Sequence, residues 1–115
     1  MIHLGTDLVR ISRFESRTHH FLRRSFTEQE INLSAGKAQS LAGRWAVKES
    51  VLKALGVGMA LPFTDIEVRS DDLGRPMLAL TGVAAARASE LGIEQWSVSI
   101  SHDGDYAIAV VVGAG

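Results

Sequence analysis

The chain of 115 residues contains no cysteine, which excludes disulfide bonds, thiolate metal sites and a cysteine nucleophile. It also has no basic N-terminal segment followed by an apolar run, so no secretory signal is predicted. The longest apolar run near the C-terminus, Tyr106 to Val112, is far too short to cross a bilayer. These absences predict a cytoplasmic protein that does not act in a membrane.

Neither sign of charge dominates the composition. Lys and Arg number 12, Asp and Glu number 13, and the formal net charge is −1. General nucleic-acid-binding proteins usually carry a strong basic excess, so no nucleic-acid partner is expected. There is also no internal repeat and no linker rich in Pro or Ser, and we predict a single domain over residues 1–115. A domain of this size has a high ratio of surface to volume, so oligomerisation would help its stability.

The first half of the chain predicts one short strand and then helices. A strand is expected from Ile2 to Leu8, stopping near Asp7, and a helix from Val9 to Phe21. Thr27-Glu28-Gln29-Glu30 matches a capping box and predicts the start of a second, short helix. A long helix should follow from Ala38 to Leu55, closed by Gly56.

The second half predicts hairpins, with one helix between them. Strands are expected over 65–69 and 76–80, a helix over 83–91 that stops at Gly92, and strands over 96–101 and 106–112. Asp103-Gly104 supplies the turn of the last hairpin. Antiparallel hairpins separated by helices predict an α+β fold, an antiparallel sheet with a long central helix.

The long helix carries charge among apolar residues that cover nearly its whole surface. Arg44, Lys48, Glu49 and Lys53 stand between those apolar positions, and partly buried charges need partners. Glu49 and Lys53 are four residues apart and suit an ordinary salt bridge. A metal ion, a phosphate or a second subunit would satisfy the same charges, and composition alone favours the salt bridge.

An acid is expected at the end of the first strand, in Gly5-Thr6-Asp7. The glycine would let a ligand or another backbone come close. Asp7 could cap the following helix, and this interpretation stands on equal terms with a metal ligand. A magnesium site uses one or two carboxylates together with waters and substrate phosphates, so Asp7 and Glu49 would suffice if they met in space.

Two further segments are candidates for binding phosphate or nucleotide. Ser97, Ser99 and Ser101 share one face of their predicted strand, and His102 follows at its end. They could bind a phosphate, although a polar outer face is the commoner explanation of such a pattern. Gly74-Arg75-Pro76 lies at a predicted hairpin, where turn chemistry explains Gly and Pro without a ligand.

The region between Leu8 and Thr27 is basic, with five arginines and only one acid, Glu15. Arg10, Arg13 and Arg17 are spaced so that they would line one face of the predicted first helix. Such a face suits an acidic protein partner, because complementary charge speeds encounter. A plain solvated helix face explains it equally well.

Taken in order, these segments resemble the holo-acyl-carrier-protein synthases, the single-domain group of 4′-phosphopantetheinyl transferases. The Trp-x-x-Lys-Glu-x-x-x-Lys-Ala segment at Trp45 to Ala54 is the most specific part, and the resemblance covers nearly the whole chain. The matching segments are Gly5-Thr6-Asp7-Leu8, Phe26 to Glu30, Leu41 to Ala54, Asp65 to Val68, Gly74-Arg75-Pro76 and Val98 to His102.

The resemblance implies a reaction and roles for particular residues. The 4′-phosphopantetheine group of coenzyme A would pass to a serine of an apo acyl carrier protein, releasing 3′,5′-ADP, in fatty acid or polyketide biosynthesis. It implies Mg²⁺ held by Asp7 and Glu49, with Lys53 as a third catalytic residue. The implied coenzyme A-binding residues are Arg44, Lys48, Lys53, Gly74, Arg75, Pro76, Ser99, Ser101 and His102, and the implied carrier-binding residues are Arg10, Arg13 and Arg17.

The resemblance also implies a homotrimer with sites at subunit interfaces. Two other hypotheses are compatible with the same residues. One is another magnesium-dependent transferase that uses a nucleotide without a carrier protein. The other is a non-catalytic oligomeric module that binds an acidic partner through its arginines.

Overall fold

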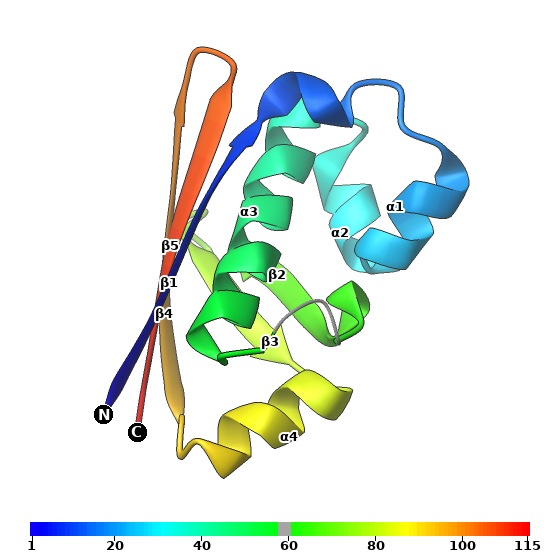
Figure 1. Cartoon of the computed structure of the whole chain (residues 1–115). Helices are drawn as coiled ribbons and strands as arrows, with labels where there is room; N and C mark the ends of the chain where they lie inside the picture. The colour runs from blue at the N-terminus through cyan, green and yellow to red at the C-terminus, as the bar shows by residue number, and fades with distance from the viewer. Residues whose placement is uncertain (58–60) are drawn as a thin grey trace.

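The computed structural model describes residues 1–57 and 61–115 of the chain. A three-stranded antiparallel sheet has the strand order β1-β5-β4, with β1 at Ile2–Arg10, β4 at Gln95–Asp103 and β5 at Tyr106–Ala114. The two ends of the chain therefore lie side by side, because Ile2 is paired with Ala114 (Figure 1).

The long helix α3, Ala38–Ala54, lies against one face of this sheet (Figure 1). Small residues on that face, such as Gly5, Ala107 and Ala109, allow the helix to come close, and all three are buried. Strand alternation turns every second side chain toward α3 and the others outward. The predicted α+β class and the long helix are confirmed.

The remaining elements pack around the sides of α3 that do not face the three-stranded sheet. The helices α1 and α2 lie on the side of α3 away from the sheet, and β2 and β3 form a separate two-stranded antiparallel sheet (Figure 1). Their bounds are η1 Ile11–Phe14, α1 His19–Ser25, α2 Glu28–Ser34, η2 Phe63–Asp65, β2 Ile66–Ser70, β3 Pro76–Leu80 and α4 Gly82–Glu90.

The capping box at the start of α2 is confirmed. The Thr27 hydroxyl accepts a hydrogen bond from the Glu30 N–H at 3.2 Å, and the Thr27 N–H donates to Glu30 Oε1 at 3.0 Å. The expected hairpins at 66–80 and 95–114 are also present, as is the helix between them.

The predicted helix from Val9 to Phe21 is wrong. β1 continues through Val9 and Arg10, which pair with Ala107 and Tyr106 of β5. A short 3₁₀ helix, η1, follows, and Ser16 then takes a left-handed backbone with φ of 54° before α1 begins at His19. Pairing with a strand almost a hundred residues away outweighed the local helical spacing.

Aromatic rings join α1, α3 and the two 3₁₀ turns into one core. The ring of Trp45 lies 5.7 Å from those of Phe14 and Phe21, between centroids, and 4.6 Å from that of Phe63. Such tilted and stacked pairs contribute beyond their buried area. They fix η1 and α1 against the middle of α3.

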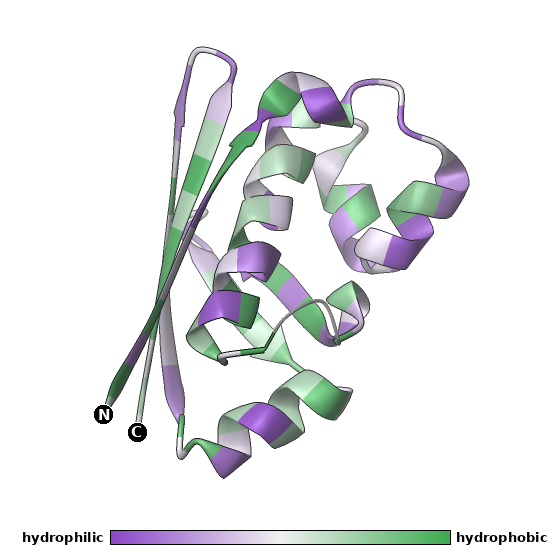
Figure 2. Cartoon of the chain, viewed as in Figure 1, coloured by the Kyte–Doolittle hydropathy of each residue, from purple (hydrophilic) through white to green (hydrophobic). Residues whose placement is uncertain are grey.

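Hydrophobic residues are frequent along β1 and β5 (Figure 2), and several of them are exposed on the outer face of the sheet. The large apolar side chains exposed on this face are Ile2, Leu4, Leu8, Tyr106, Ile108 and Val110, and the polar Thr6 and Arg10 share it. Among the described residues, no helix is long and apolar enough to pass through a membrane.

Candidate active site

Asp7 and Glu49 come together where β1 crosses α3. Asp7 shares the inward face of β1 with Gly5 and Val9, and Glu49 lies in the middle of α3. Burial and then the negative charge of Asp7 raise the pKa of Glu49, while the charges of Lys53 and Arg13 oppose that rise. Charged groups from two segments that are far apart in sequence, Asp7 and Arg13 in one and Glu49 and Lys53 in the other, thus influence one another.

Gly5 permits this close approach. A Cβ atom built on Gly5 would lie 1.8 Å from the carbonyl oxygen of Ser50, so no side chain fits between strand and helix. The Ser50 hydroxyl donates to the carbonyl oxygens of Ala46, at 2.7 Å, and Ala109, at 3.3 Å. The expectation that Gly5 lets another backbone come close is confirmed, and the backbone is that of α3.

Lys53 reaches back from α3 to β1. Its ammonium donates to the carbonyl oxygen of Thr6 at 2.8 Å and lies 3.4 Å from Asp7 Oδ1. The Lys53 side chain is 54% exposed, so the ammonium stays accessible to a ligand. Its ion pair is with Asp7 of β1, and the simple i,i+4 pairing with Glu49 is not among the ion pairs of the described residues.

The two carboxylates suit a magnesium ion that takes its other ligands from water and phosphate. Asp7 lies inside β1, paired with Ala109, so the helix-cap interpretation of Asp7 is wrong. In the described part of the chain, no group of three or more His, Cys, Asp or Glu could hold a metal. Hard cations of this kind are bound by one or two carboxylates plus substrate phosphates, which is the donor set that Asp7 and Glu49 offer.

Lys48 does not fit the coenzyme A-binding role predicted for it. Its side chain has no exposed surface, and its ammonium contacts Glu30 Oε1 at 2.7 Å and the carbonyl oxygens of Phe63 and Ile66. Burial lowers the pKa of Lys48, and the charge and hydrogen bond of Glu30 oppose that effect. All three donors are engaged within the chain, so Lys48 is a structural residue.

Arg44 and His102 flank the N-terminal half of α3. Arg44 Nη1 donates to the Ser40 hydroxyl at 2.6 Å, while its Nε is buried without a partner among the described residues. Burial lowers the pKa of Arg44, and Glu30 opposes this shift. His102 Nε2 lies 3.3 Å from the carbonyl oxygen of Gln39. A half-buried guanidinium can bind an anion only through its accessible N–H groups, and the buried Nε of Arg44 is not one of them.

The four-residue phosphate cluster predicted on β4 is not formed within one chain. Ser97, Ser99 and Ser101 are exposed and belong to the outward-facing set, opposite Val112, Val110 and Ile108 of β5. His102 points to the other face, where its ring approaches Gly43 of α3. Alternation along the strand separates the imidazole from the hydroxyls.

The Gly74-Arg75-Pro76 segment closes the β2–β3 hairpin. Asp71 Oδ1 accepts from the Arg75 N–H at 2.9 Å, and Asp71 Oδ2 lies 3.2 Å from Arg75 Nε. The backbone N–H of Arg75 is the largest cause of the lowered pKa of Asp71. Arg75 and Pro76 line a cleft of about 470 Å³ between β3 and β4, together with Trp96 and Ser97.

Arg10, Arg13 and Arg17 are all exposed, but they do not share a helix face. Arg10 ends β1 and lies over the ring of Tyr106 at 5.1 Å, and Arg13 is in η1. Arg17 follows η1 in a loop and stacks over Phe21 at 3.8 Å. The predicted stripe along one helix is therefore wrong, although three exposed cations remain on consecutive segments.

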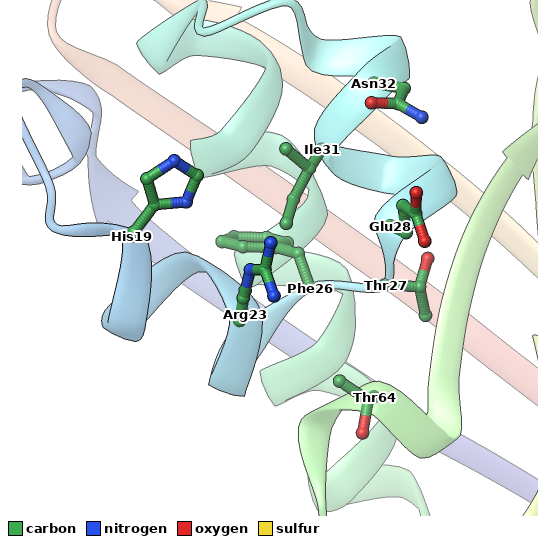
Figure 3. Close-up of a pocket in the computed structure, with 8 residues that line it drawn as sticks. All are labelled: His19, Arg23, Phe26, Thr27, Glu28, Ile31, Asn32 and Thr64. Atoms are coloured by element: carbon green, nitrogen blue, oxygen red, sulfur yellow. The ribbon is translucent and has the colours of Figure 1, made fainter.

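A groove of about 400 Å³ opens between α1, α2 and η2 (Figure 3). His19 and Arg23 lie on its α1 side, Glu28 and Asn32 on its α2 side, and Phe26 and Ile31 form an apolar floor. None of the predicted site residues lines it. The carboxylate pair therefore does not belong to this groove.

The chain matches a known protein family. The family model of the 4′-phosphopantetheinyl transferase superfamily matches residues 3–111. The chain belongs to this superfamily. Asp7, Glu49 and Lys53 all fall inside the matched region, as does the β4–β5 hairpin up to Val111.

Individual relatives of the same superfamily match along the full chain. A holo-[acyl-carrier-protein] synthase from Herpetosiphon aurantiacus is 47% identical, and the match covers 100% of both chains. A structure of holo-[acyl-carrier-protein] synthase from Helicobacter pylori in complex with coenzyme A is 37% identical, with a TM-score of 0.85 over 96% of this chain and 99% of that one. The Neisseria meningitidis synthase is 31% identical, with a TM-score of 0.87 over 100% of both chains.

Two contacts in this superfamily member were missed from the sequence. Glu30 was identified only as part of a capping box, although it also pairs with Lys48 in the interior. Asp105 has no role in the sequence-based prediction, although its carboxylate contacts Ser12. Lys48 lies among apolar residues of the long helix, and this was a signal that it needed a buried acidic partner such as Glu30. The sequence contained no such signal for the contact between Asp105 and Ser12.

Proposed function

We propose that this protein transfers the 4′-phosphopantetheine group of coenzyme A to a serine of an apo acyl carrier protein, releasing 3′,5′-ADP. The observation that carries the proposal is the meeting of Asp7, Glu49 and Lys53 at the crossing of β1 and α3, in a chain of this superfamily. Two carboxylates beside an exposed ammonium form a site for a metal ion and a diphosphate.

Asp7 and Glu49 would hold the magnesium ion. Burial raises the pKa of Glu49 and the negative charge of Asp7 raises it further, and a divalent cation would offset both effects. When bound, the ion would neutralise charge on the phosphate oxygens of coenzyme A. The superfamily resemblance and the hard oxygen donors support magnesium for this role.

The reaction is a phosphoryl transfer, in which positioning and charge neutralisation matter most. The serine oxygen of the carrier forms a bond to the β-phosphorus, and the bond from that phosphorus to the bridging oxygen of 3′,5′-ADP breaks. Lys53, whose ammonium is exposed, would stabilise the charge on the transferred and leaving groups. The serine proton needs an acceptor. Glu49, Asp7 or a water molecule could take it, because each can act as a base.

The coenzyme A would extend from this centre toward the residues implied to bind its nucleotide. Arg44 is a half-buried cation beside Ser40, and it would supply positive charge for a phosphate group of coenzyme A. His102 lies beside the same helix, and Arg75 and Pro76 line the cleft between β3 and β4, where the adenine of coenzyme A would bind. Ser99 and Ser101 face outward, so they would serve a coenzyme A bound at a subunit interface rather than the site of their own chain.

We also propose a homotrimer built on the outer face of the three-stranded sheet. Ile2, Leu4, Leu8, Ile108 and Val110 form a contiguous apolar surface across β1 and β5. A patch of this kind on a small domain marks an interaction surface. Burying it between copies would also bring the outward-facing serines of β4 to a subunit interface.

Intact-mass analysis tests the reaction. Apo acyl carrier protein incubated with this protein, coenzyme A and Mg²⁺ should gain the mass of one phosphopantetheine, and a chelator should abolish the gain. Carriers of fatty acid and of polyketide synthesis should be assayed in parallel. No gain with any of them would favour a non-catalytic module, in particular if a carrier still binds.

A further inference from the structure

One carboxylate ties the β4–β5 turn to the segment that follows β1. Asp105 Oδ1 accepts from the Ser12 N–H at 3.0 Å, and Asp105 Oδ2 accepts from the Ser12 hydroxyl at 2.8 Å. The Ile11 N–H donates to the carbonyl oxygen of Asp105 at 2.8 Å. We call this set of three hydrogen bonds the Ser12–Asp105 clamp.

The clamp adds hydrogen bonds to an element that is otherwise held by the packing of Phe14 against Trp45 of α3. η1 is a 3₁₀ helix of four residues, and no side chain caps its start. Short 3₁₀ helices have poor internal hydrogen-bond geometry. Phe14 anchors the end of η1 in the core, whereas the residues beyond it pass through the left-handed Ser16 into a loop. At the start of η1, where Ile11 is only partly buried, the clamp supplies the hydrogen bonds that orient the backbone.

The clamp lies on the surface rather than in the core. Ser12 and Asp105 are both exposed, so these hydrogen bonds contribute little to global stability. Their effect is instead on geometry, because Asp105 accepts from two successive backbone N–H groups, those of Ile11 and Ser12, and also from the Ser12 hydroxyl. The residue that directly follows Ser12 is Arg13.

We propose that Asp105 is a positioning residue for the carrier protein, which it serves by holding η1 so that Arg13 faces the bound carrier. This inference rests on the proposed function. The same turn ends β4, whose last residues include His102. The clamp therefore also sets the spacing between the segment that would meet the carrier and a strand that would meet coenzyme A.

The direction in which carrier affinity changes when Asp105 is replaced distinguishes a positioning role from a purely electrostatic one. Asp105 is an acid near exposed arginines, so removing its charge alone would strengthen the attraction of an acidic carrier. Loss of the clamp should weaken carrier binding instead. Asp105→Ala and Asp105→Asn lose the same charge, but Asn keeps an oxygen that can accept from the Ser12 N–H.

The experiment measures kcat, the KM for apo carrier and the KM for coenzyme A, together with direct binding of apo carrier in the absence of coenzyme A. Asp105→Ala should raise the carrier KM and Kd roughly threefold to tenfold, the loss expected for one charge-assisted hydrogen bond at the surface. The KM for coenzyme A and the melting temperature should stay nearly unchanged. Asp105→Asn should fall between Asp105→Ala and the wild type.

Two further variants identify the route of the effect. Ser12→Ala removes the hydroxyl donor without changing charge and should shift carrier binding in the same direction as Asp105→Ala. In an Arg13→Ala background, Asp105→Ala should cause no further loss, because the clamp acts through Arg13. Glu15→Gln, which removes a neighbouring exposed acid with no role in the clamp, should leave the carrier KM equal or lower.

The proposal is overturned if Asp105→Ala leaves carrier binding unchanged or improves it, if both KM values rise together, or if the loss persists undiminished without Arg13. If the wild-type protein binds the carrier but transfers nothing, the proposed function fails while the Kd series still tests the clamp. A wild-type protein that binds no carrier would overturn both.

Discussion

The ammonium of Lys48 lies 2.7 Å from Glu30 Oε1, and neither side chain has any exposed surface. Glu30 also accepts from two backbone groups, the Thr27 N–H at 3.0 Å and the Val68 N–H at 2.9 Å. This buried ion pair thereby connects α2, α3, η2 and β2. Because Glu49 directly follows Lys48 in α3, the same contacts hold the helix turn that carries one of the two proposed metal-binding carboxylates.

Lys48→Met is expected to destabilise the protein by about 3–5 kcal/mol, because it leaves Glu30 buried without a counter-charge. Urea unfolding followed by circular dichroism measures this change. Adding Glu30→Leu should not restore stability, since the N–H groups of Thr27 and Val68 would then lose their acceptor. Lys37→Met, at an exposed lysine before α3, is the control and should change stability little. A mild effect of Lys48→Met would contradict a structural role.

Glu49→Gln should reduce kcat by at least about a hundredfold, because the amide cannot supply the charge that a metal ion and a proton acceptor require. Folding and binding of apo carrier should persist. Intact-mass kinetics and a carrier-binding assay measure the two effects separately. The matched control is Glu28→Gln, an exposed glutamate of α2. Unchanged turnover in Glu49→Gln would sink the metal assignment.

Gly5→Ala should damage both stability and activity, since its Cβ would overlap the Ser50 carbonyl oxygen and push β1 away from α3. We expect a loss of about 1–3 kcal/mol or more, typical of overpacking, together with lower kcat because Asp7 moves from Glu49. Gly113→Ala is the comparison, because its Cβ would meet only side-chain atoms of Ile93 and Trp96. Equal effects of the two substitutions would argue against the strand–helix contact as the cause.

Glu67 offers a test by pH. A hydrogen bond from the Thr27 hydroxyl at 2.7 Å, with further help from Arg69, lowers the pKa of Glu67 below its ordinary 4.5, although burial opposes the shift. A depressed pKa means that the carboxylate stabilises the fold above that ordinary value and that this stability is lost as pH falls through the lower, folded-state pKa.

Glu67→Gln should therefore lower the free energy of unfolding by about 1 kcal/mol at neutral pH. The difference from wild type should shrink as the pH is lowered below the ordinary carboxylate range, because the wild-type Glu67 then loses its charge as well. Urea unfolding over a pH series measures it. A difference that stays constant with pH would show that the charge of Glu67 is not the stabilising element.

Val110→Lys should dissociate the proposed trimer, because it places a charge in the middle of the apolar outer face of the sheet. Light scattering after size-exclusion chromatography measures the mass. Leu33→Lys makes the same change at an exposed leucine of α2 and should leave the mass unaltered. A wild-type protein that is monomeric at all concentrations, or a Val110→Lys variant that stays trimeric, would refute this interface.

The sequence by itself determined the elements whose signals are local. The capping box at Thr27, the long helix ended by Gly56 and the Asp103-Gly104 turn all appear as expected, because each depends on hydrogen bonds or backbone angles within a few residues. The Trp-x-x-Lys-Glu segment pointed to the family, and the comparisons confirm it. Within this segment, however, the sequence did not distinguish a buried lysine from one that binds a ligand.

Only the tertiary structure decided contacts between segments that are distant along the chain. β1 continues through Arg10 because it pairs with β5, about a hundred residues later in the chain. Residues 9 and 10 are therefore in a strand, and the predicted helix with its row of arginines does not form. The same long-range packing buried Lys48 on Glu30, turned His102 away from the strand's serines and brought Asp7 to Glu49. Local spacing fixes which residues share a face, but the partner of that face is set by packing, which no local pattern encodes.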